Sequence, residues 1–373
     1  FLRRRIEVPL ANDGHGRLTA DQRREDPFDK YVSPKKRQAA VEGQPYNVDI
    51  EVTRRCPSTC RFCTSSSGDT DVMIPAERMF SLLGELREVG YQQIFWSGGE
   101  PLLHPAIFEL IEQARQLGFG NGIFSGGLVL TKKMARKVVE LYQRRLINVF
   151  GIHIDTLNQD SFDKMHTNPR ELARRVEGYR NLLEAGYPPE RILPCMTLTS
   201  AAAEHVEELI NWYVDEMGAR FLEITVFKPN GAGDQSKDLE PGLSDVRRAF
   251  LYRAQKFGNE NWSRIGSTEC STVQCRTNLC LTSDGCVMPC GQLPHEFSVG
   301  NFYQESFVDI FQRSWETISH RCFQVKGKCA SCENNDICVG CRAAAYYYLG
   351  DIEGPDPKCW LNPEAKEYYL REV

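Results

Sequence analysis

Hydrophobic and polar positions alternate along residues 46–227 with two different periods. Short apolar runs with a period near two are typical of strands, and the longer stretches between them, with apolar positions three and four residues apart, are typical of helices. Six strands separated by helices predict a parallel sheet with right-handed crossovers, which closes into a full or partial α/β barrel. The pattern places strands at 46–52, 92–96, 120–124, 147–154, 192–199 and 221–227, and helices at 75–89, 106–117, 131–144, 170–184 and 202–217.

Polar side chains follow or end several of these strands. Ser125 comes directly after the third strand, and His153 and Asp155 share one face of the fourth by its period of two. On the last two strands, the same alternation places Thr197 and Glu223 on the face that we expect to point into the barrel. If they face the interior they line a ligand cavity, although each is equally compatible with a hydrogen-bonded core position. We take Asp155, Glu223 and His153 as candidates for catalytic proton transfer, from parity alone.

The periodic region is flanked by two segments of different character. Residues 1–45 are charged and turn-rich without sustained periodicity, which predicts an extension that wraps the body or stays mobile. A stretch rich in Gly, Pro and Asp at 228–244 leads into one predicted helix at 246–257 and then into a cysteine-rich tail. We therefore expect an extension (1–45), a barrel (46–235) and a second module (236–373).

The loop after the first strand holds three closely spaced cysteines, Cys56, Cys60 and Cys63, in the run CPSTCRFC. Three thiolates this close can hold three corners of a cubane [4Fe–4S] cluster, which normally takes four protein ligands, so one iron remains open to a small molecule. A zinc knot is the alternative, but structural zinc prefers two-residue spacings and four protein ligands.

A glycine-rich turn, SGGEP, follows the second strand. Gly98 and Gly99 lack the Cβ atoms that would keep a ligand away from the backbone, and Glu100 can accept hydrogen bonds from an ammonium group. Most such turns are only turns, but this one lies one strand–helix unit after the cysteine loop, and both motifs fall at the same edge of the sheet.

With these two motifs the chain resembles the radical S-adenosylmethionine (SAM) superfamily. The resemblance implies a partial (β/α)6, TIM-like barrel in which the cysteine loop holds a [4Fe–4S] cluster and S-adenosylmethionine chelates the open iron. It implies that the turn binds the methionyl amino group, and that reductive cleavage gives a 5′-deoxyadenosyl radical that abstracts hydrogen. Relatives often have serine, which contacts the ribose, where His153 lies. The cofactor-binding candidates are Ser97, Gly98, Gly99, Glu100, Ser125 and Thr197.

Cysteine is unusually frequent: the chain has 15, of which 11 lie after residue 269. The odd total and the tight pairs argue against a disulfide framework and favour metal clusters in a reducing cytoplasm. The spacings Cys-x4-Cys-x14-Cys and Cys-x2-Cys-x5-Cys-x2-Cys-x17-Cys suit two further cubanes with four thiolates each. Zinc ribbons remain the alternative, because Cys329-x2-Cys332 and Cys338-x2-Cys341 would satisfy one.

The tail resembles the SPASM extension of radical SAM enzymes, through TSDGCVMPC, CASCENNDICVGC and DPKCW. The resemblance implies a small auxiliary-cluster domain, and three [4Fe–4S] clusters in all. It assigns one auxiliary cluster to Cys270, Cys275, Cys290 and Cys341, and the other to Cys329, Cys332, Cys338 and Cys359. Cys280 and Cys286 lie between Cys275 and Cys290, in the hairpin that the resemblance implies there. Either cysteine can replace a ligand of the first auxiliary cluster.

Charge and hydropathy exclude some partners. The net charge is −5 and Lys and Arg are scattered, so we expect no nucleic-acid binding. No apolar run approaches the ~18 residues that a membrane span needs, and no signal peptide leads the chain, so we expect no membrane partner and a cytoplasmic enzyme.

SPASM enzymes mostly oxidise or cross-link ribosomally made peptides, so the resemblance implies an oxidoreductase of that kind, with a reductant such as flavodoxin or ferredoxin as partner. A small metabolite, such as a tetrapyrrole side chain, is the alternative substrate, because the tail also resembles haem-pathway members. A hypothesis from another class is a non-catalytic iron–sulfur electron carrier, but a carrier needs neither the SGGEP turn nor an open iron.

Overall fold

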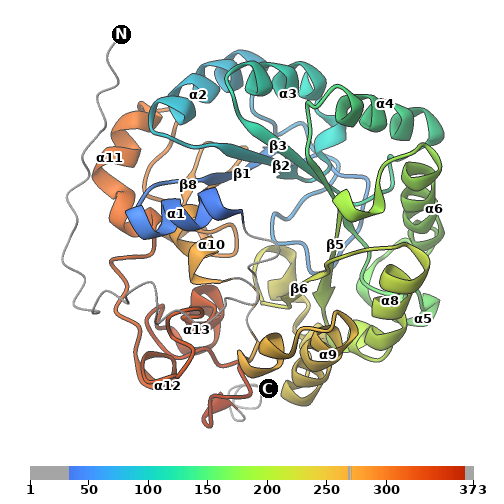
Figure 1. The fold of residues 1–373 in the computed structure, drawn as a ribbon, viewed down its shortest axis with the longest axis vertical. Coiled ribbons are helices and arrows are strands. Elements are labelled where there is room, and N and C mark those ends of the chain that lie inside the picture. Colours follow the sequence, from blue (N-terminus) through green and yellow to red (C-terminus); the bar gives the residue numbers. More distant parts are fainter. Residues whose placement is uncertain (1–32, 268, 270, 366–373) are drawn as a thin grey trace.

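The computed structural model describes residues 33–267, 269 and 271–365. Its centre is one sheet with the strand order β6-β5-β4-β3-β2-β1-β7-β8, in which β1 to β6 pair in parallel (Figure 1). This confirms the predicted parallel α/β architecture with six barrel strands. The strands are β1 (Asn47–Thr53), β2 (Gln93–Gly98), β3 (Gly120–Ser125), β4 (Val149–His153), β5 (Ile192–Leu198), β6 (Glu223–Val226), β7 (Cys280–Leu281) and β8 (Val287–Met288).

Helices cover the outer face of this sheet. Figure 1 shows α2, α3, α4, α6 and α8 arranged around the strands, and the apolar sides of strands and helices form one large core cluster. The helices are α1 (Pro34–Glu42), α2 (Ala76–Glu88), α3 (Ile107–Gln116), α4 (Lys132–Gln143), α5 (Gln159–Met165), α6 (Glu171–Glu184), α7 (Ser200–Ala203), α8 (Val206–Asn211), α9 (Leu243–Lys256), α10 (Thr272–Thr277), α11 (Phe307–Ile318), α12 (Gly327–Ala330) and α13 (Arg342–Leu349).

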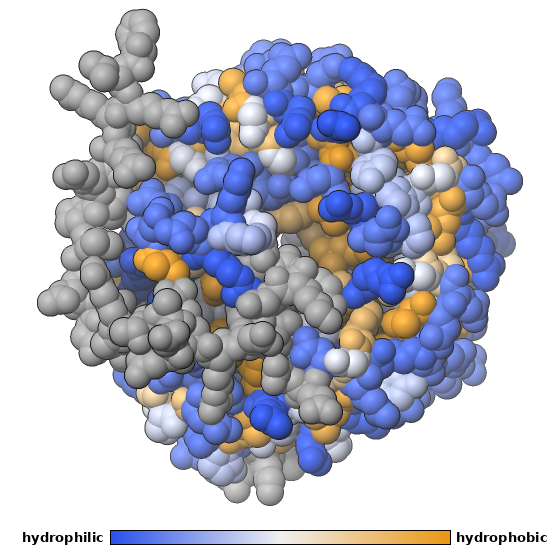
Figure 2. Space-filling view, in the orientation of Figure 1, coloured by the Kyte–Doolittle hydropathy of each residue, from blue (hydrophilic) through white to orange (hydrophobic). Residues whose placement is uncertain are grey.

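The two faces of the strands differ in exposure. Along β5, Ile192, Pro194 and Met196 are buried against the helices, whereas Cys195 and Thr197 point the other way and keep partial exposure. Because side chains of a strand alternate between faces, the concave inner face of the sheet remains accessible to water. Figure 2 shows one face of the molecule hollowed near its centre, with hydrophobic residues in the hollow and hydrophilic residues around it.

One predicted helix is divided in the structure, and a short helix occurs where none was predicted. The helix expected at 202–217 is divided into α7 and α8 and ends in a π-helical turn, Trp212–Glu216, because the backbone leaves helical geometry at His205. The short helix α5 was not expected, since its seven residues are too few to show a clear helical period.

The last part of the extension expected at 1–45 contains a helix that the sequence analysis did not predict. Residues 34–42 form α1, which Ser33 caps by accepting a hydrogen bond from the Lys36 amide at 3.2 Å. The indole Nε1 of Trp315 in α11 donates to the Gly43 carbonyl at 2.9 Å, so the end of α1 is held against the C-terminal part of the chain. Residues 1–32 lie outside the described residues.

The C-terminal part joins the barrel through the sheet itself. The short strand β7 pairs in parallel with β1, and β8 pairs antiparallel with β7. The Thr272 amide in α10 donates to the Ile337 carbonyl at 2.7 Å, which joins α10 to the segment between α12 and α13. Within the described chain, no helix has both the length and the apolar character needed to cross a bilayer.

Candidate functional site

The loop of the three cysteines begins at the carboxyl end of β1 and folds back on itself. The amide of Cys56 donates to the Gly68 carbonyl at 2.9 Å, and the Gly68 amide donates to the Arg54 carbonyl at 3.0 Å. On its other side the loop is joined to the end of α5, where Arg61 N donates to the Met165 carbonyl at 2.9 Å. These backbone bonds hold the thiols at the rim of the barrel without using their sulfur atoms.

Cys60 is surrounded by cations from α6 and the segment before it. The Sγ atom accepts from Arg175 Nη2 at 3.4 Å and lies 3.0 Å from Ser58 Oγ. Burial alone would raise the pKa of Cys60, but the charges of Arg175 and His166 and the bonds to its sulfur lower the pKa to about 6. A thiolate is therefore favoured here, and the thiolate is the form that binds iron.

Cys56 and Cys63 show the opposite effect. Burial, together with the charges of Glu100 and the neighbouring thiols, raises the pKa of Cys56 to about 12, and burial and Cys60 also raise the pKa of Cys63. Three thiolates gathered without a metal ion repel one another, and bound iron would remove that repulsion. The donor set thus fits a metal cluster.

The separation of the sulfur atoms bears on the zinc alternative. Among the described residues, only Asp284, Cys286 and His295 form a group of three metal-ligating side chains whose ligand atoms lie within 4.8 Å of one another. The sulfur atoms of the three loop cysteines do not all lie within 4.8 Å of one another, and neither do those of any three cysteines at 329–341. A single zinc ion needs closely grouped ligands, whereas a cubane takes each thiolate on a different iron, so the spacing favours clusters.

The Gly-Gly-Glu turn is hydrogen-bonded directly to the start of the cysteine loop. Gly99 N donates to the Thr53 carbonyl at 2.7 Å, and Glu100 N donates to the Arg55 carbonyl at 2.8 Å. Arg55 immediately precedes Cys56, so the two sequence motifs are adjacent in space. The hydroxyl of Ser97 donates to the Ile50 carbonyl at 3.3 Å and thus also links β2 to β1.

Glu100 is buried at the centre of this rim. Its Oε2 accepts from Ser125 Oγ at 2.8 Å and from Gly126 N at 3.1 Å, while Oε1 accepts from Leu102 N at 3.3 Å. Burial raises the pKa of Glu100 to about 7, although these hydrogen bonds act in the other direction. A carboxylate so placed gains from a cationic partner, since burial disfavours its charge.

Asp155 connects β4 to β5. Its Oδ1 accepts from Thr197 N at 2.7 Å and lies 3.0 Å from His153 Nε2, whereas its buried Oδ2 has no hydrogen-bond partner. Burial favours the neutral acid, but His153 and His166 outweigh it and hold the pKa of Asp155 well below its usual range. The structure thus brings three of the predicted residues, His153, Asp155 and Thr197, into one group.

Glu223 stands apart from that group. The register places His153, Cys195 and Glu223 in one row across β4, β5 and β6, and Glu223 Oε2 accepts from Cys195 Sγ at 3.8 Å. Burial and the nearby carboxylates of Asp49 and Glu269 raise the pKa of Glu223. Of the three candidates for proton transfer, Glu223 thus has a raised pKa, whereas Asp155 has a lowered one.

A buried charged group beside Cys60 was not predicted from the sequence. Arg175 donates to Ser58 Oγ, and to the His153 carbonyl at 3.0 Å. Glu171 accepts from Ser58 and from Thr59, both at 3.0 Å. The signal was present, because Arg175 falls on the apolar face of α6, which is otherwise formed by residues such as Leu172, Tyr179 and Leu182. A charge on the buried face of a helix indicates a specific partner.

Several of the cysteines predicted to hold auxiliary clusters lie near one another in the C-terminal part. Cys329 and Cys332 lie close to each other, and burial, Asp356 and Cys329 raise the pKa of Cys359 to about 11. Backbone amides donate to several of these sulfurs: Asp356 N to Cys329 at 3.2 Å and Gly340 N to Cys338 at 3.3 Å. Amide hydrogen bonds to sulfur are typical of iron–sulfur ligands.

The other group is less completely described. Cys290 and Cys341 pack with Cys280 in a small cluster, Cys341 also caps α13, and Cys275 lies in α10. Cys270 lies outside the described residues. Because Cys280 is next to Cys290, its predicted ability to replace a ligand of this group stays open.

A family model described as the radical SAM superfamily matches residues 50–213, which contain the cysteine loop, the Gly-Gly-Glu turn and five of the barrel strands. Residues 50–213 thus form a radical SAM domain. The enzyme therefore uses a [4Fe–4S] cluster and S-adenosylmethionine, and the hypothesis of a non-catalytic electron carrier is not supported.

Two curated relatives match this radical SAM enzyme over most of its length. It is 25% identical to an AdoMet-dependent heme synthase of Methanosarcina barkeri, over 88% of this chain and 99% of that protein. It is 26% identical to the mycofactocin maturase MftC of Mycolicibacterium smegmatis, over 83% of this chain and 81% of that protein.

Solved structures support the fold. anSMEcpe with bound AdoMet has a TM-score of 0.64 at 17% identity, covering 87% of this chain and 95% of that chain. Streptococcus suis SuiB bound to the precursor peptide SuiA has a TM-score of 0.65 at 18% identity, covering 87% and 79%. The similarity extends over most of both chains and therefore includes the part of the fold that follows the barrel.

Proposed function

We propose that Cys56, Cys60 and Cys63 hold the [4Fe–4S] cluster and that Glu100 binds the amino group of S-adenosylmethionine against Gly98 and Gly99. Bound together, cluster and cofactor would supply the radical that removes hydrogen from a substrate C–H bond. The chain's contribution is position: the Gly-Gly-Glu turn is hydrogen-bonded to the residue before Cys56, so the two binding motifs cannot move independently. Ser125 orients Glu100, while Thr197 with Asp155 forms the neighbouring wall.

The pH dependence of cofactor binding tests the role of Glu100. Its pKa of about 7 means that the carboxyl is largely protonated below pH 7 and then cannot pair with an ammonium group. The affinity for S-adenosylmethionine should therefore fall by up to about tenfold per unit as the pH drops below 7. Glu100→Gln should weaken binding by about 10- to 100-fold and flatten this profile, because a hydrogen bond to a charged group is lost.

Calorimetric titration of the reconstituted enzyme with S-adenosylmethionine between pH 6 and pH 8 measures the affinity and its dependence on pH. Glu109→Gln, on the exposed side of α3, is the matched control and should leave affinity and profile unchanged. A steep profile that survives in Glu100→Gln would assign the titration to another group.

For the substrate, we propose a ribosomally made peptide that is oxidised or cross-linked. The observation that carries this proposal is the similarity of this chain to MftC and to SuiB over most of its length. On the inner face, Asp49 and Glu269 raise the pKa of Glu223, and Glu269 pairs with Lys228 Nζ at 2.8 Å. MftC is named as a maturase, and SuiB is seen with a precursor peptide, which agrees with this assignment.

A tetrapyrrole side chain is the second candidate substrate. Two AdoMet-dependent heme synthases, from Methanosarcina barkeri and Oleidesulfovibrio alaskensis, are 25% and 24% identical to this chain over 88% and 85% of its length. These matches run through the cysteine-rich tail as well as the barrel.

The two substrates are separated by a single assay. The reconstituted enzyme is incubated with dithionite and S-adenosylmethionine, and with either a short peptide encoded beside its gene or a carboxylated porphyrin precursor. The proposal predicts 5′-deoxyadenosine release coupled to a peptide whose mass falls by the hydrogens removed. Coupled decarboxylation of the tetrapyrrole with an unchanged peptide would overturn it.

We further propose that two auxiliary [4Fe–4S] clusters are bound by the sets Cys270, Cys275, Cys290, Cys341 and Cys329, Cys332, Cys338, Cys359, and that they accept the electron left on the substrate. Replacing both Cys332 and Cys338 with alanine should then remove about four of about twelve irons per chain. Cleavage of S-adenosylmethionine should continue while product formation falls strongly. Undiminished product formation by this variant would refute the electron-accepting role.

Net oxidation also requires a proton acceptor. Glu223 is proposed for this step, because its raised pKa and its place on the inner face suit it to take up a proton, with His153 and Asp155 as positioning groups. The electrons for cofactor cleavage come from a reductant such as flavodoxin or ferredoxin. A reducing cytoplasm agrees with the fourteen described cysteines, all of which are free thiols.

A further inference from the structure

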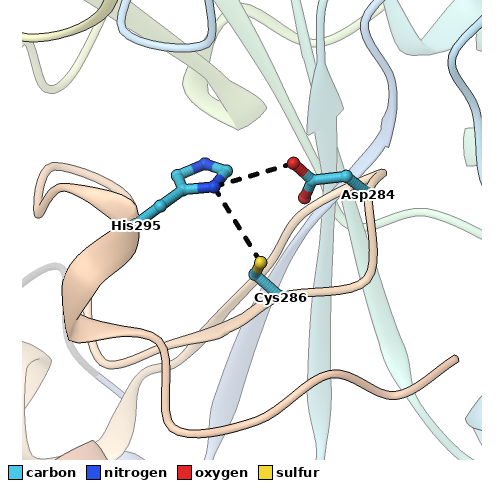
Figure 3. Close-up of side chains that lie close together, drawn as sticks. All are labelled: Asp284, Cys286 and His295. Carbon is cyan, nitrogen blue, oxygen red and sulfur yellow. Dashed lines mark hydrogen bonds and ion pairs between the residues drawn. The ribbon is translucent and has the colours of Figure 1, made fainter. Parts of the chain in front are cut away.

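The hairpin of β7 and β8 carries polar side chains that the radical chemistry does not use. Figure 3 shows Asp284 and Cys286, on either side of the hairpin turn, facing His295 from the 3-10 helix His295–Phe297. His295 Nδ1 lies 3.6 Å from Asp284 Oδ2 and 3.9 Å from Cys286 Sγ. These are the three ligand atoms within 4.8 Å of one another.

The distances do not suit direct hydrogen bonding. A separation of 3.6 Å between nitrogen and oxygen is beyond an ordinary hydrogen bond, and 3.9 Å to a thiol is weak at best. For zinc bound tetrahedrally, the bond lengths to nitrogen, oxygen and sulfur give edges of about 3.4 Å between N and O and about 3.6 Å between N and S. The observed distances exceed these edges by only a few tenths of an Å.

The convergence on one ring nitrogen also excludes a catalytic relay. In a Cys-His-Asp relay the acid and the nucleophile contact different nitrogens of the imidazole, so that a proton can pass through the ring. Here the carboxylate and the thiol both approach Nδ1 (Figure 3). Three ligand atoms gathered within 4.8 Å of one another suit a metal site better than a relay.

The turn is rigidly placed before any ion binds. Ser283 donates from both its amide and its hydroxyl to Glu51 of β1, at 3.1 and 2.6 Å. Gly285, with φ of +95°, lets the chain reverse between Asp284 and Cys286, and a side chain there would collide with Asn301 and Tyr303. The ligands on both sides of the turn are thus held in position by the barrel.

Arg54 binds the Asp284 carboxylate, which is also one of the three ligand groups. Its Nη2 donates to Asp284 Oδ2 at 2.8 Å, which leaves this oxygen a second lone pair for a cation. The side chains of Asp284 and His295 are 35% and 54% exposed, so an ion can enter from solvent. With three protein ligands, one coordination position remains for water or another small ligand.

We propose that Asp284, Cys286 and His295 form a mononuclear zinc site with one exchangeable position, separate from the iron–sulfur ligands. Mixed sulfur, nitrogen and oxygen donors suit zinc, and the ionised thiol and carboxylate balance its charge. The site would connect the hairpin turn to the segment that follows Cys290 and so enclose that cysteine in a closed loop.

The test uses the holoenzyme with its clusters reconstituted, dialysed against zinc sulfate, with zinc and iron measured by mass spectrometry. Wild type should retain about one zinc per chain that both His295→Ala and Cys286→Ser lose, with iron content unchanged. X-ray absorption at the zinc edge should show one sulfur at about 2.3 Å and lighter ligands at about 2.0 Å. His205→Ala and Cys322→Ser, which alter a partly exposed His and an exposed Cys elsewhere, are the controls and should keep the zinc.

Three outcomes would overturn the proposal. The first is equal zinc in wild type and His295→Ala, an exposed substitution that leaves the fold undisturbed. The second is the absence of sulfur from the zinc spectrum. The third is a loss of iron in Cys286→Ser, which would assign this cysteine to an auxiliary cluster instead.

Discussion

Replacing Cys60 with alanine should abolish 5′-deoxyadenosine formation and remove about four of about twelve irons from the reconstituted enzyme. The reason is that two thiolates do not retain a cubane that already lacks a fourth protein ligand. Cys60 has the largest effect among the three because its thiol, beside Arg175, is the one whose pKa is lowered. Iron quantitation and chromatographic assay of the nucleoside measure the two effects.

The matched control is Cys322→Ala, an exposed thiol in the C-terminal part that belongs to neither predicted cluster group. It should keep the iron content and the nucleoside release of the wild type. Nucleoside release that persists in Cys60→Ala at the wild-type rate would mean that S-adenosylmethionine is cleaved at another cluster, and the assignment of the loop would then be wrong.

Gly99→Ala should lower kcat/KM for S-adenosylmethionine cleavage by about 10²-fold, since displacing a binding group by about 1 Å has effects of that size. A Cβ atom on Gly99 would collide with the Arg55 carbonyl and lie 2.7 Å from the Arg54 carbonyl, both of which are backbone atoms. The ends of β1 and β2 would have to separate, which moves Glu100 away from the cysteine loop. Unfolding should become easier by about 1–3 kcal/mol.

Gly84→Ala provides the comparison, because a Cβ there meets nothing within 4 Å and the residue lies on the exposed side of α2. Alanine should stabilise the helix by about 0.5–1 kcal/mol and leave kinetics unchanged. Steady-state assays and denaturant titrations of both variants decide the matter. Equal kinetics in the two would show that close approach at Gly99 is not required.

The barrel could be predicted from the sequence because its strands and helices are long enough to show their periods. Each of the six predicted strands overlaps an observed strand, and the motif loops lie at one edge of the sheet as the parallel order requires. The short elements could not be found in this way: β7 and β8 have two residues each, so pairing with β1, not local pattern, defines them.

The sequence analysis predicted which residues belong to the candidate site but not which of their side chains contact one another. Strand parity placed His153, Asp155 and Glu223 on one face, yet only the structure joins Asp155 to Thr197 and separates Glu223 from the pair. The contacts of Arg175 with Cys60 and of His295 with Cys286 come from tertiary packing, which sequence spacing does not encode. Polar positions were thus easier to predict than their partners.

The addition of β7 to β1 has a consequence for how the chain can be cut. In a fragment ending after β6, β1 would become a bare border strand whose unpaired amides and carbonyls invite self-association. We therefore expect that the barrel does not remain stable in solution without the C-terminal part. Fragments truncated after β6 should precipitate under conditions in which the full-length chain does not.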